Sequence, residues 1–448
     1  MTAVGIDAIE IRTGKLRLDL PNTFAPKKGE DPEKYTKGLG LEASSFPDVY
    51  EDIVTMGANA AKRLMDRKGI APEDVGRIDV ATESAFDHAK PVSTYIAGCL
   101  EQVYDGDFRH ANKGERKFAC VAGTQAIDDA YNWIRAGRNR GRSALVIATD
   151  TALYERGDPG EATQGAGAVA MLVDEDPSIV ELSTDQGYGS MDETDFLKPN
   201  QQFPSVDGKR SVQVYLSRMR EALEDYEAVA GPVGVEDVSY APFHTPFPGM
   251  VRKAGLFAYR HITRDSPVED EIAAAIGRRQ PREDEYDSRE AYEEAIREYM
   301  DELKGAEQYR EWYAETIEPT LELSRVVGNW YTGSVHLARA SALRHAAARG
   351  LDSEFVGRRL LVGSYGSGAQ AEIHAETVRD GWREEIEALD IDDQLESRYD
   401  LAFEEYEQVH DVHDFDKSVE VEELTAPEAE FVFTGWGRMN ERTYEYVE

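Results

Sequence analysis

Apolar positions in the first 176 residues alternate between two spacings, one typical of strands and one typical of helices. Short apolar runs predict strands at 3–11, 77–84, 143–150 and 165–176. Between them, apolar residues recur three or four positions apart, which predicts helices at 51–70, 94–104 and 124–137, the last closed by Gly137. Alternation of this kind predicts an α/β fold in which helices cover a sheet.

The rest of the chain repeats this alternation. The pattern predicts helices at 211–226 and 329–347, a strand running into a polar loop at 237–247, and a strand, a glycine-rich turn and a second strand at 358–373. The pairing of 165–173 with 363–373 indicates two related halves, which we place at 1–174 and 175–448.

Two stretches depart from this pattern. Residues 264–318 are charged, helix-prone and poor in large apolar side chains, so we expect a solvated helical excursion within the second half. Residues 380–425 are very acidic, and we expect them to be exposed.

Composition narrows the class of protein. The chain has 448 residues and a formal net charge of −37, which disfavours nucleic acid and anionic membrane surfaces as partners. Acidic residues are spread over the whole chain, and self-repulsion of this size is tolerable where concentrated salt screens it. An enzyme of a high-salt cytoplasm is therefore expected, although an ordinary acidic protein remains the alternative. The start of the chain lacks a signal-peptide pattern, and no apolar run approaches the length of a membrane span.

Cys120 is the first candidate for chemistry. The chain has two cysteines, too few for a disulfide framework at this length. Cys120 lies where an apolar run meets the small residues that open a helix, and a helix N-terminus favours a thiolate and can hold an oxyanion. A buried, inert thiol is an equal alternative. Cys99, inside an apolar helical pattern, is expected to be structural.

Three other side chains stand out, each with a plain structural alternative. Glu83 follows a predicted strand, where a carboxylate needs a partner or a raised pKa; it could also cap a turn. His244 lies in a proline-rich loop and could polarise a carbonyl or be a core histidine. Asn329 precedes a helix and is most simply an N-cap. The glycine-rich turn at 364–368 has neither dinucleotide-binding spacing nor a following helix, and no metal-ligand spacing such as H-E-x-x-H occurs.

Eight stretches, taken together and in order, resemble the 3-hydroxy-3-methylglutaryl-CoA synthase family. They are ATESAFDHAKP (81–91), KFACVAGTQA (117–126), IATDTALY (147–154), GEATQGAGAVAMLV (160–173), TDFLKPN (194–200), FHTPFPGMVRKA (243–254), VGNWYTGS (327–334) and GSYGSGAQAE (363–372).

The resemblance implies a thiolase-like fold with α-β-α-β-α layering, a cytoplasmic homodimer, and no resident cofactor, because CoA thioesters are the substrates. It implies condensation of acetyl-CoA with acetoacetyl-CoA and water through an acetyl-cysteine, giving 3-hydroxy-3-methylglutaryl-CoA and CoA.

The alternatives explain fewer of these residues. A ketoacyl-ACP synthase III-like enzyme lacks a glutamate in this context, so Glu83 argues against that class. A non-catalytic acyl-CoA-binding scaffold would not need Cys120, Glu83, His244 and Asn329 together, and a cysteine hydrolase leaves Glu83 unexplained.

The same resemblance implies roles for individual residues. Cys120 would be the acylated nucleophile, Glu83 the general acid/base and His244 the group that binds the acetoacetyl carbonyl. Asn329 would bind the acyl carbonyl, and the main-chain N–H groups of Cys120 and Ser364 would form the oxyanion hole. The remaining residues would support or contact the substrates: Asp150, Asp195, Tyr154, Thr163, Tyr215 and, on the CoA arm, Lys253.

Two departures from the family pattern bear on these roles. Pro248 stands where many relatives carry lysine, and Val121 follows the cysteine in place of the commoner aromatic residue. Because the chain is strongly acidic and CoA is an anion, we expect a local basic patch made of Arg252, Lys253 and Arg210.

Overall fold

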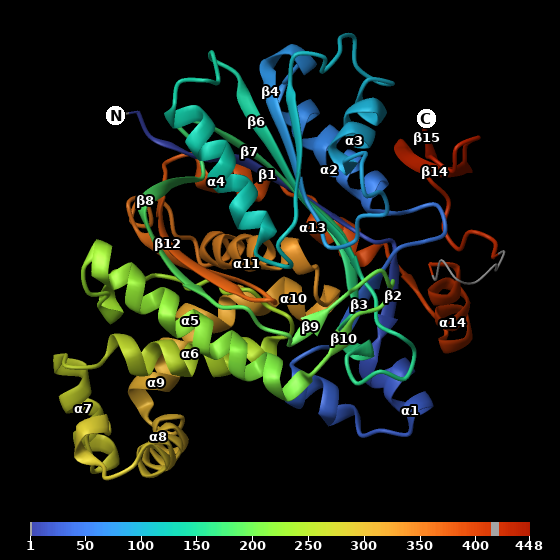
Figure 1. Cartoon of the computed structure of the whole chain (residues 1–448). Helices are drawn as coiled ribbons and strands as arrows, with labels where there is room; N and C mark the ends of the chain where they lie inside the picture. Colours follow the sequence, from blue (N-terminus) through green and yellow to red (C-terminus); the bar gives the residue numbers. More distant parts are fainter. Residues whose placement is uncertain (1, 414–420) are drawn as a thin grey trace.

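The structure, a computed structural model, describes residues 2–413 and 421–448. Its centre is an eight-stranded mixed sheet that draws strands from both parts of the chain (Figure 1). In spatial order the strands are β11 (Arg359–Gly366), β12 (Gln370–Val378), β8 (Val180–Ser190), β1 (Val4–Thr13), β7 (Gly165–Glu175), β6 (Ser143–Ala152), β4 (Val75–Ala81) and β5 (Asn112–Arg116). The predicted α/β class is confirmed.

The layers are held together by three large hydrophobic cores, in each of which helices pack against strands. The first contains α2 (Ile53–Lys68) and α3 (Val92–Leu100) against one face of β1, β4, β6 and β7. The second surrounds α4 (Ala122–Arg135) and α11 (Ser334–Ala348), between strands of both parts. The third packs α5 (Gly208–Ala230) and α6 (Pro248–Ile262) on β11 and β12.

Alternation along the strands explains how one sheet serves two cores. On β7, Val169 and Met171 face α4 and α11, whereas Ala170 and Leu172 face α2. This two-residue period is the signature of a strand buried on both sides. The predicted strands and helices of the first 176 residues are confirmed, whereas 237–247 pairs with β11 only through isolated bridges at Tyr240 and Phe243.

The excursion at 264–318 is helical, as predicted, and extends away from the sheet in Figure 1. It comprises α7 (Pro267–Ile276), α8 (Arg289–Leu303) and α9 (Glu307–Trp312). It is not solvated all round, because Ile272, Tyr299 and Trp312 are buried in the core that contains α6. These sparse apolar residues are enough to fix one face of the excursion.

The expectation that 380–425 is exposed is wrong for most of its described residues, and 414–420 lie outside the description. Trp382, Ile391 and Tyr406 are fully buried. They belong to α12 (Trp382–Glu387), α13 (Ile391–Glu396) and α14 (Phe403–Val412), whose acidic residues share the segment with a narrow apolar face.

Smaller elements complete the chain. They are β2 (Leu16–Asp19), β3 (Ala43–Phe46) and β13 (Tyr399–Asp400) in one sheet, the pair β9 (Phe196–Leu197) and β10 (Ser205–Val206), the pair β14 (Glu430–Trp436) and β15 (Arg442–Val447), and the helices α1 (Ala25–Lys28) and α10 (Glu322–Val327). Among the described residues, no helix combines the length and apolarity needed to cross a membrane.

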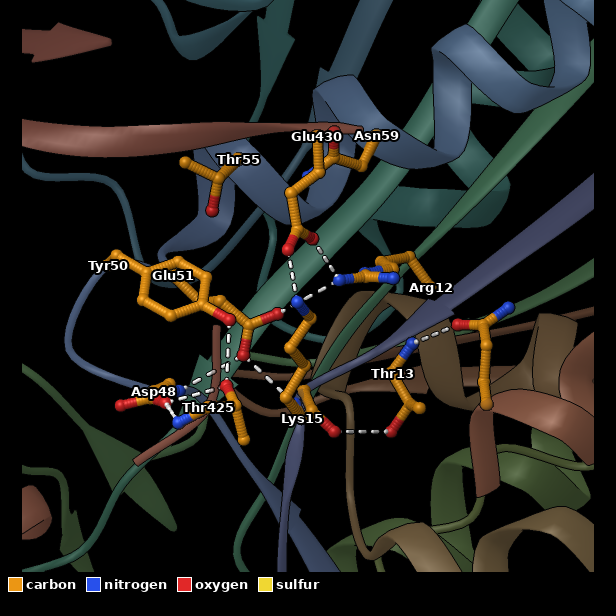
Figure 2. Close-up of polar contacts among 12 residues, drawn as sticks. Arg12, Thr13, Lys15, Asp48, Tyr50, Glu51, Thr55, Asn59, Thr425 and Glu430 are labelled. Atoms are coloured by element: carbon orange, nitrogen blue, oxygen red, sulfur yellow. Dashed lines mark hydrogen bonds and ion pairs between the residues drawn. The ribbon is translucent and has the colours of Figure 1, made fainter. Parts of the chain in front are cut away.

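A buried ion cluster ties the C-terminal hairpin to the start of the chain (Figure 2). The Glu430 carboxylate pairs with both Arg12 and Lys15, and Arg12 also lies 3.4 Å from Glu51. Burial raises the pKa of Glu51, while Arg12 acts in the opposite direction. Two carboxylates and two cations here satisfy one another, which is the condition for burying charge at moderate cost.

Candidate active site

Cys120 and Glu83 meet at one edge of the sheet. The parallel strands β4, β5 and β6 end at this edge, so the residues that follow them lie close together. The Cys120 thiol donates a hydrogen bond to Glu83 Oε1 across 2.7 Å. Ala119, just before the cysteine, has a left-handed φ of 44°, which is strain of the kind that surrounding structure must enforce.

Asp150 holds this edge in place from the end of β6. Its Oδ1 accepts hydrogen bonds from the Glu83 N–H (2.8 Å), the Ser84 hydroxyl (2.7 Å) and the Thr82 hydroxyl (3.0 Å). Its Oδ2 accepts from the N–H (3.1 Å) and hydroxyl (2.5 Å) of Thr332. Asp150 is fully buried and well supplied with donors, so it positions Glu83 and its neighbours instead of reacting.

The site favours the neutral forms of its reactive groups. Burial and the adjacent Asp150 raise the pKa of Glu83 to about 7, opposed by the Cys120 hydrogen bond and Lys198. Burial and the Glu83 carboxylate raise the pKa of Cys120 well above its usual value. Burial and Glu83 thus act against the thiolate that the helix terminus is expected to favour.

Asn329 lies beside this pair but does not cap α11, whose N-cap is Gly333. Its Oδ1 accepts from the Tyr331 N–H (2.9 Å) and the Ser334 hydroxyl (2.7 Å), and its own N–H donates to Thr163 O (3.1 Å). Within the described ranges its Nδ2 amide has no acceptor, so this amide is available to a substrate carbonyl. Tyr154 is also buried near Cys120 and Glu83. Burial, and to a smaller extent charge on Cys120 and Glu83, raise the pKa of the Tyr154 hydroxyl.

His244 belongs to a second group of side chains. Its N–H donates to Gly363 O (2.7 Å) and its carbonyl accepts from the Tyr215 hydroxyl (2.9 Å). The ring lies 6.3 Å from that of Tyr365, whose hydroxyl donates to Asp195 (2.9 Å). Burial lowers the pKa of His244 to about 3, so the imidazole is neutral and can act as a hydrogen-bond donor without carrying charge.

Ser364 lies in β11, where the direction of its main chain can be read from its neighbours. Leu361 and Gly363 donate their N–H groups to the main-chain oxygens of Tyr240 and Pro242, on one side of β11. Successive N–H groups of a strand point to opposite sides, so the N–H of Ser364 points to the other side, toward β12. The Ser364 hydroxyl contacts that of Thr124. Its main-chain N–H is thus engaged within the sheet and is poorly placed for an oxyanion.

The turn after β11 offers a better donor. A Cβ on Gly366 would lie 2.6 Å from Phe118 O and 2.9 Å from Val121 N, so this turn presses directly on the main chain around Cys120. Among the described residues the N–H of the next residue, Ser367, has no acceptor. The Ser367 N–H is therefore better placed than that of Ser364 to act together with the N–H of Cys120.

Gly366→Ala tests this contact. Two of the three clashing atoms are main-chain atoms and the third is Val121 Cγ1, so the Cys120 turn must shift, and we expect acetylation of Cys120 to slow about a hundredfold. Gly208→Ala is the matched control, because nothing lies within 4 Å of its added Cβ. The rate of acetyl-adduct formation measures the effect; an unchanged rate in Gly366→Ala would show that the two turns are not in close contact.

The basic residues expected at the CoA arm are only partly free. Lys253 is exposed on α6, and no acid pairs with it in the described part of the chain. Arg252 donates to the main-chain oxygens of Lys37 (2.6 Å) and Gly38 (2.9 Å), which leaves its charge without an acidic partner. Arg210 forms an ion pair with Glu193 (2.8 Å) and so contributes little positive charge.

Sequence reasoning missed several residues of the site. Phe196 and Tyr331 pack with Cys120 in one small apolar cluster, and their rings lie 6.0 Å apart. Lys198 Nζ donates to Glu83 O (3.3 Å). The stretch TDFLKPN contains both Phe196 and Lys198, so the signal was present, but nothing in the sequence shows which side chains of that stretch reach the site.

Comparisons with known proteins agree along the whole chain. Residues 2–178 match the model of the hydroxymethylglutaryl-coenzyme A synthase N terminal family, and residues 188–436 match that of its C terminal. The chain is 76% identical to a hydroxymethylglutaryl-CoA synthase of Haloferax volcanii over 100% of both chains. It is 30% identical to one of Gibberella zeae over 91% of this chain and 90% of that protein.

Solved structures give the same result. The structure of MvaS in complex with 3-hydroxy-3-methylglutaryl coenzyme A matches with a TM-score of 0.84 at 28% identity and covers 100% of both chains. An HMG-CoA synthase complexed with CoA matches with a TM-score of 0.74 at 26% identity, over 99% of this chain and 100% of that one.

Proposed function

Because this chain belongs to the hydroxymethylglutaryl-CoA synthase family, we propose that Cys120, Glu83 and His244 carry out the reaction of that family. The enzyme condenses acetyl-CoA with acetoacetyl-CoA and water to give 3-hydroxy-3-methylglutaryl-CoA and CoA, a step of the mevalonate pathway. The observation that carries the assignment of residues is the Cys120 Sγ to Glu83 Oε1 hydrogen bond.

In the first step the Cys120 sulfur attacks the acetyl carbonyl of acetyl-CoA. The thiol proton leaves, the thioester bond to CoA breaks, and CoA departs as the free thiol. The N–H groups of Cys120 and Ser367 stabilise the negative oxygen of the tetrahedral intermediate. The product is an acetyl thioester on Cys120.

In the second step the acetyl methyl group becomes the carbon nucleophile. Glu83, with a pKa near 7, takes a methyl proton, and the new carbanion equivalent attacks the ketone of acetoacetyl-CoA. The neutral imidazole of His244 donates a hydrogen bond to the acetoacetyl carbonyl, and Asn329 donates to an acyl carbonyl. Glu83 then returns its proton to the new alkoxide, which yields the tertiary alcohol.

In the third step water attacks the thioester on Cys120. The carbon–sulfur bond breaks, the acyl group leaves as a carboxylate of 3-hydroxy-3-methylglutaryl-CoA, and the thiol regains its proton. We infer that the residues Asp150, Asp195, Tyr154, Thr163 and Tyr215 hold the groups that act in these steps. We also infer a cytoplasmic homodimer that needs no resident cofactor.

Lys253→Ala is expected to raise the Michaelis constants for both CoA substrates about two- to fivefold and leave kcat unchanged. The reason is that an exposed lysine contributes on the order of 0.2–1 kcal/mol to a contact with a phosphate. Lys304→Ala is the control, since Lys304 is exposed on the excursion and paired with Asp301 (2.7 Å). Unchanged constants for both substrates would remove Lys253 from the CoA site.

The function itself is tested with purified protein in molar KCl. Acetyl-CoA and acetoacetyl-CoA are added together, and the products are identified by mass spectrometry. Equal amounts of 3-hydroxy-3-methylglutaryl-CoA and free CoA are expected. Release of CoA without the condensed product would indicate a hydrolase and contradict the proposal.

A further inference from the structure

Lys198 is a charged residue at the reacting centre that the mechanism above leaves without a role. It follows β9, and its ammonium donates to the main-chain oxygen of Glu83 across 3.3 Å. The side chain is half-buried. Burial lowers the pKa of Lys198, while Glu83 and Asp150 oppose this. An ammonium is costly to desolvate, so its placement here implies a charge that it compensates.

The segment 191–198, which carries Lys198, is held in place by main-chain and side-chain contacts. Met191 and Ala369 exchange two main-chain hydrogen bonds (3.0 and 2.7 Å), and Asp195 accepts from the Gly368 N–H (3.2 Å). These contacts attach the segment to the turn that supplies Ser367. Phe196 then packs on Tyr331, which directs the next residues of the segment toward Glu83.

The groups that face Glu83 come from four parts of the fold. They are the Cys120 thiol before α4, the Asp150 carboxylate of β6, the hydroxyls of Tyr154 and Tyr331, and the Lys198 ammonium. Asp150 and burial favour the protonated carboxyl group of Glu83. The Cys120 hydrogen bond and Lys198 favour the carboxylate. In the described ranges, Lys198 is the cation that acts on Glu83.

Acylation changes this balance. When Cys120 becomes a thioester, its sulfur loses the hydrogen that it donates to Glu83 Oε1. Lys198 is then left to oppose burial and Asp150 at the moment when Glu83 must accept a methyl proton. We propose, on the basis of the function proposed above, that Lys198 is a positioning residue that keeps Glu83 ionised in the acetyl-enzyme, so that condensation and not acetylation depends on it.

The proposal predicts the pH dependence of Lys198→Met. Without the ammonium, the pKa of Glu83 rises, so its base form appears only at higher pH. We expect the acidic limb of the condensation rate to move up by about one pH unit, with about a tenfold loss below the limb and near-normal rates above it. Acetylation of Cys120 by acetyl-CoA alone is expected to stay within about twofold of the unmodified enzyme.

The experiment compares Lys198→Met, Lys198→Gln and Lys198→Arg with the unmodified enzyme in molar KCl. Adduct formation is followed by mass spectrometry and condensation by product formation from pH 6 to 9. Lys198→Arg keeps the charge and should restore the limb, and Lys209→Met, at an exposed lysine, is the control. Thermal unfolding shows whether each variant is folded, and the Gln variant replaces the Met variant if the latter is not.

Three results would overturn the proposal. The first is an acidic limb of the condensation rate that stays at the same pH in both Lys198→Met and Lys198→Gln. The second is an equal loss of acetylation and condensation. The third is a condensation rate of Lys198→Arg that is no higher than that of Lys198→Met. The proposed function is judged separately, because the unmodified enzyme must form both adduct and product in the same experiment. Its failure to do so would reject the reaction and not merely the role of Lys198.

Discussion

Cys120→Ala is expected to abolish both the acetyl adduct and the condensation, with a loss of at least about a thousandfold in turnover. Among the described residues, the sulfur is the only nucleophile that the geometry places against both Glu83 and the Ser367 turn, and alanine leaves nothing to acylate. Binding of CoA substrates should survive, because the substitution removes one buried atom and no charge.

Cys99→Ala is the matched control for this variant. Cys99 is buried in α3 with no ion or hydrogen-bond role in the described structure, and burial raises its pKa. Its loss should leave turnover within about twofold while slightly lowering the unfolding temperature. Substantial condensation by Cys120→Ala, measured as product over several turnovers, would contradict an acyl-cysteine mechanism.

Glu83→Ala is expected to separate the two half-reactions. Condensation should fall on the order of 10²–10⁴-fold, because Glu83 is the base that we propose for the methyl proton. Acetylation should be largely retained. Glu83 raises the pKa of the Cys120 thiol, so its removal makes the thiolate more accessible and offsets the loss of the hydrogen-bond acceptor.

Two measurements check this separation. The acetyl adduct is quantified after exposure to acetyl-CoA alone, and product is then followed after acetoacetyl-CoA is added. Glu83→Gln provides a control of similar shape, which should also acetylate and fail to condense. If Glu83→Ala condenses at a normal rate, another base acts; if it fails to acetylate, Glu83 is needed to activate the thiol.

Much of the fold could be predicted from the sequence because its elements are strongly periodic. The strands around Val169 and Leu361 and the helix around Ile127 each bury an unbroken apolar face. The segment 380–425 is less exposed than its charge predicts, because each of its short helices carries a few buried apolar residues among the acidic ones, such as Trp382 in α12 and Tyr406 in α14. Overall charge predicts exposure only where no such apolar residues accompany it.

The site was predicted less completely, for physical reasons that act over long sequence separations. Cys120, Glu83 and His244 could be singled out as candidates from the sequence, but their roles came from the family resemblance. The protonation of Cys120 depends on burial and a carboxylate 37 positions away, which no local pattern encodes. Similarly, the proposal of Ser367 in place of Ser364 at the oxyanion hole depends on the register of β11 against the 240–244 segment.

The most direct test of the central claim is to observe the intermediate on Cys120 and follow its fate. The protein is incubated with acetyl-CoA carrying a carbon label in its acetyl group, alone in molar KCl, and is freed of unbound substrate. One portion is digested, and the mass of the Cys120 peptide is measured by mass spectrometry. The other portion is kept intact for the addition of acetoacetyl-CoA. A labelled acetyl group on that peptide is predicted. When unlabelled acetoacetyl-CoA is added, the label should leave the protein and appear in 3-hydroxy-3-methylglutaryl-CoA. A peptide without label, or a label that acetoacetyl-CoA does not remove into this product, would contradict the account.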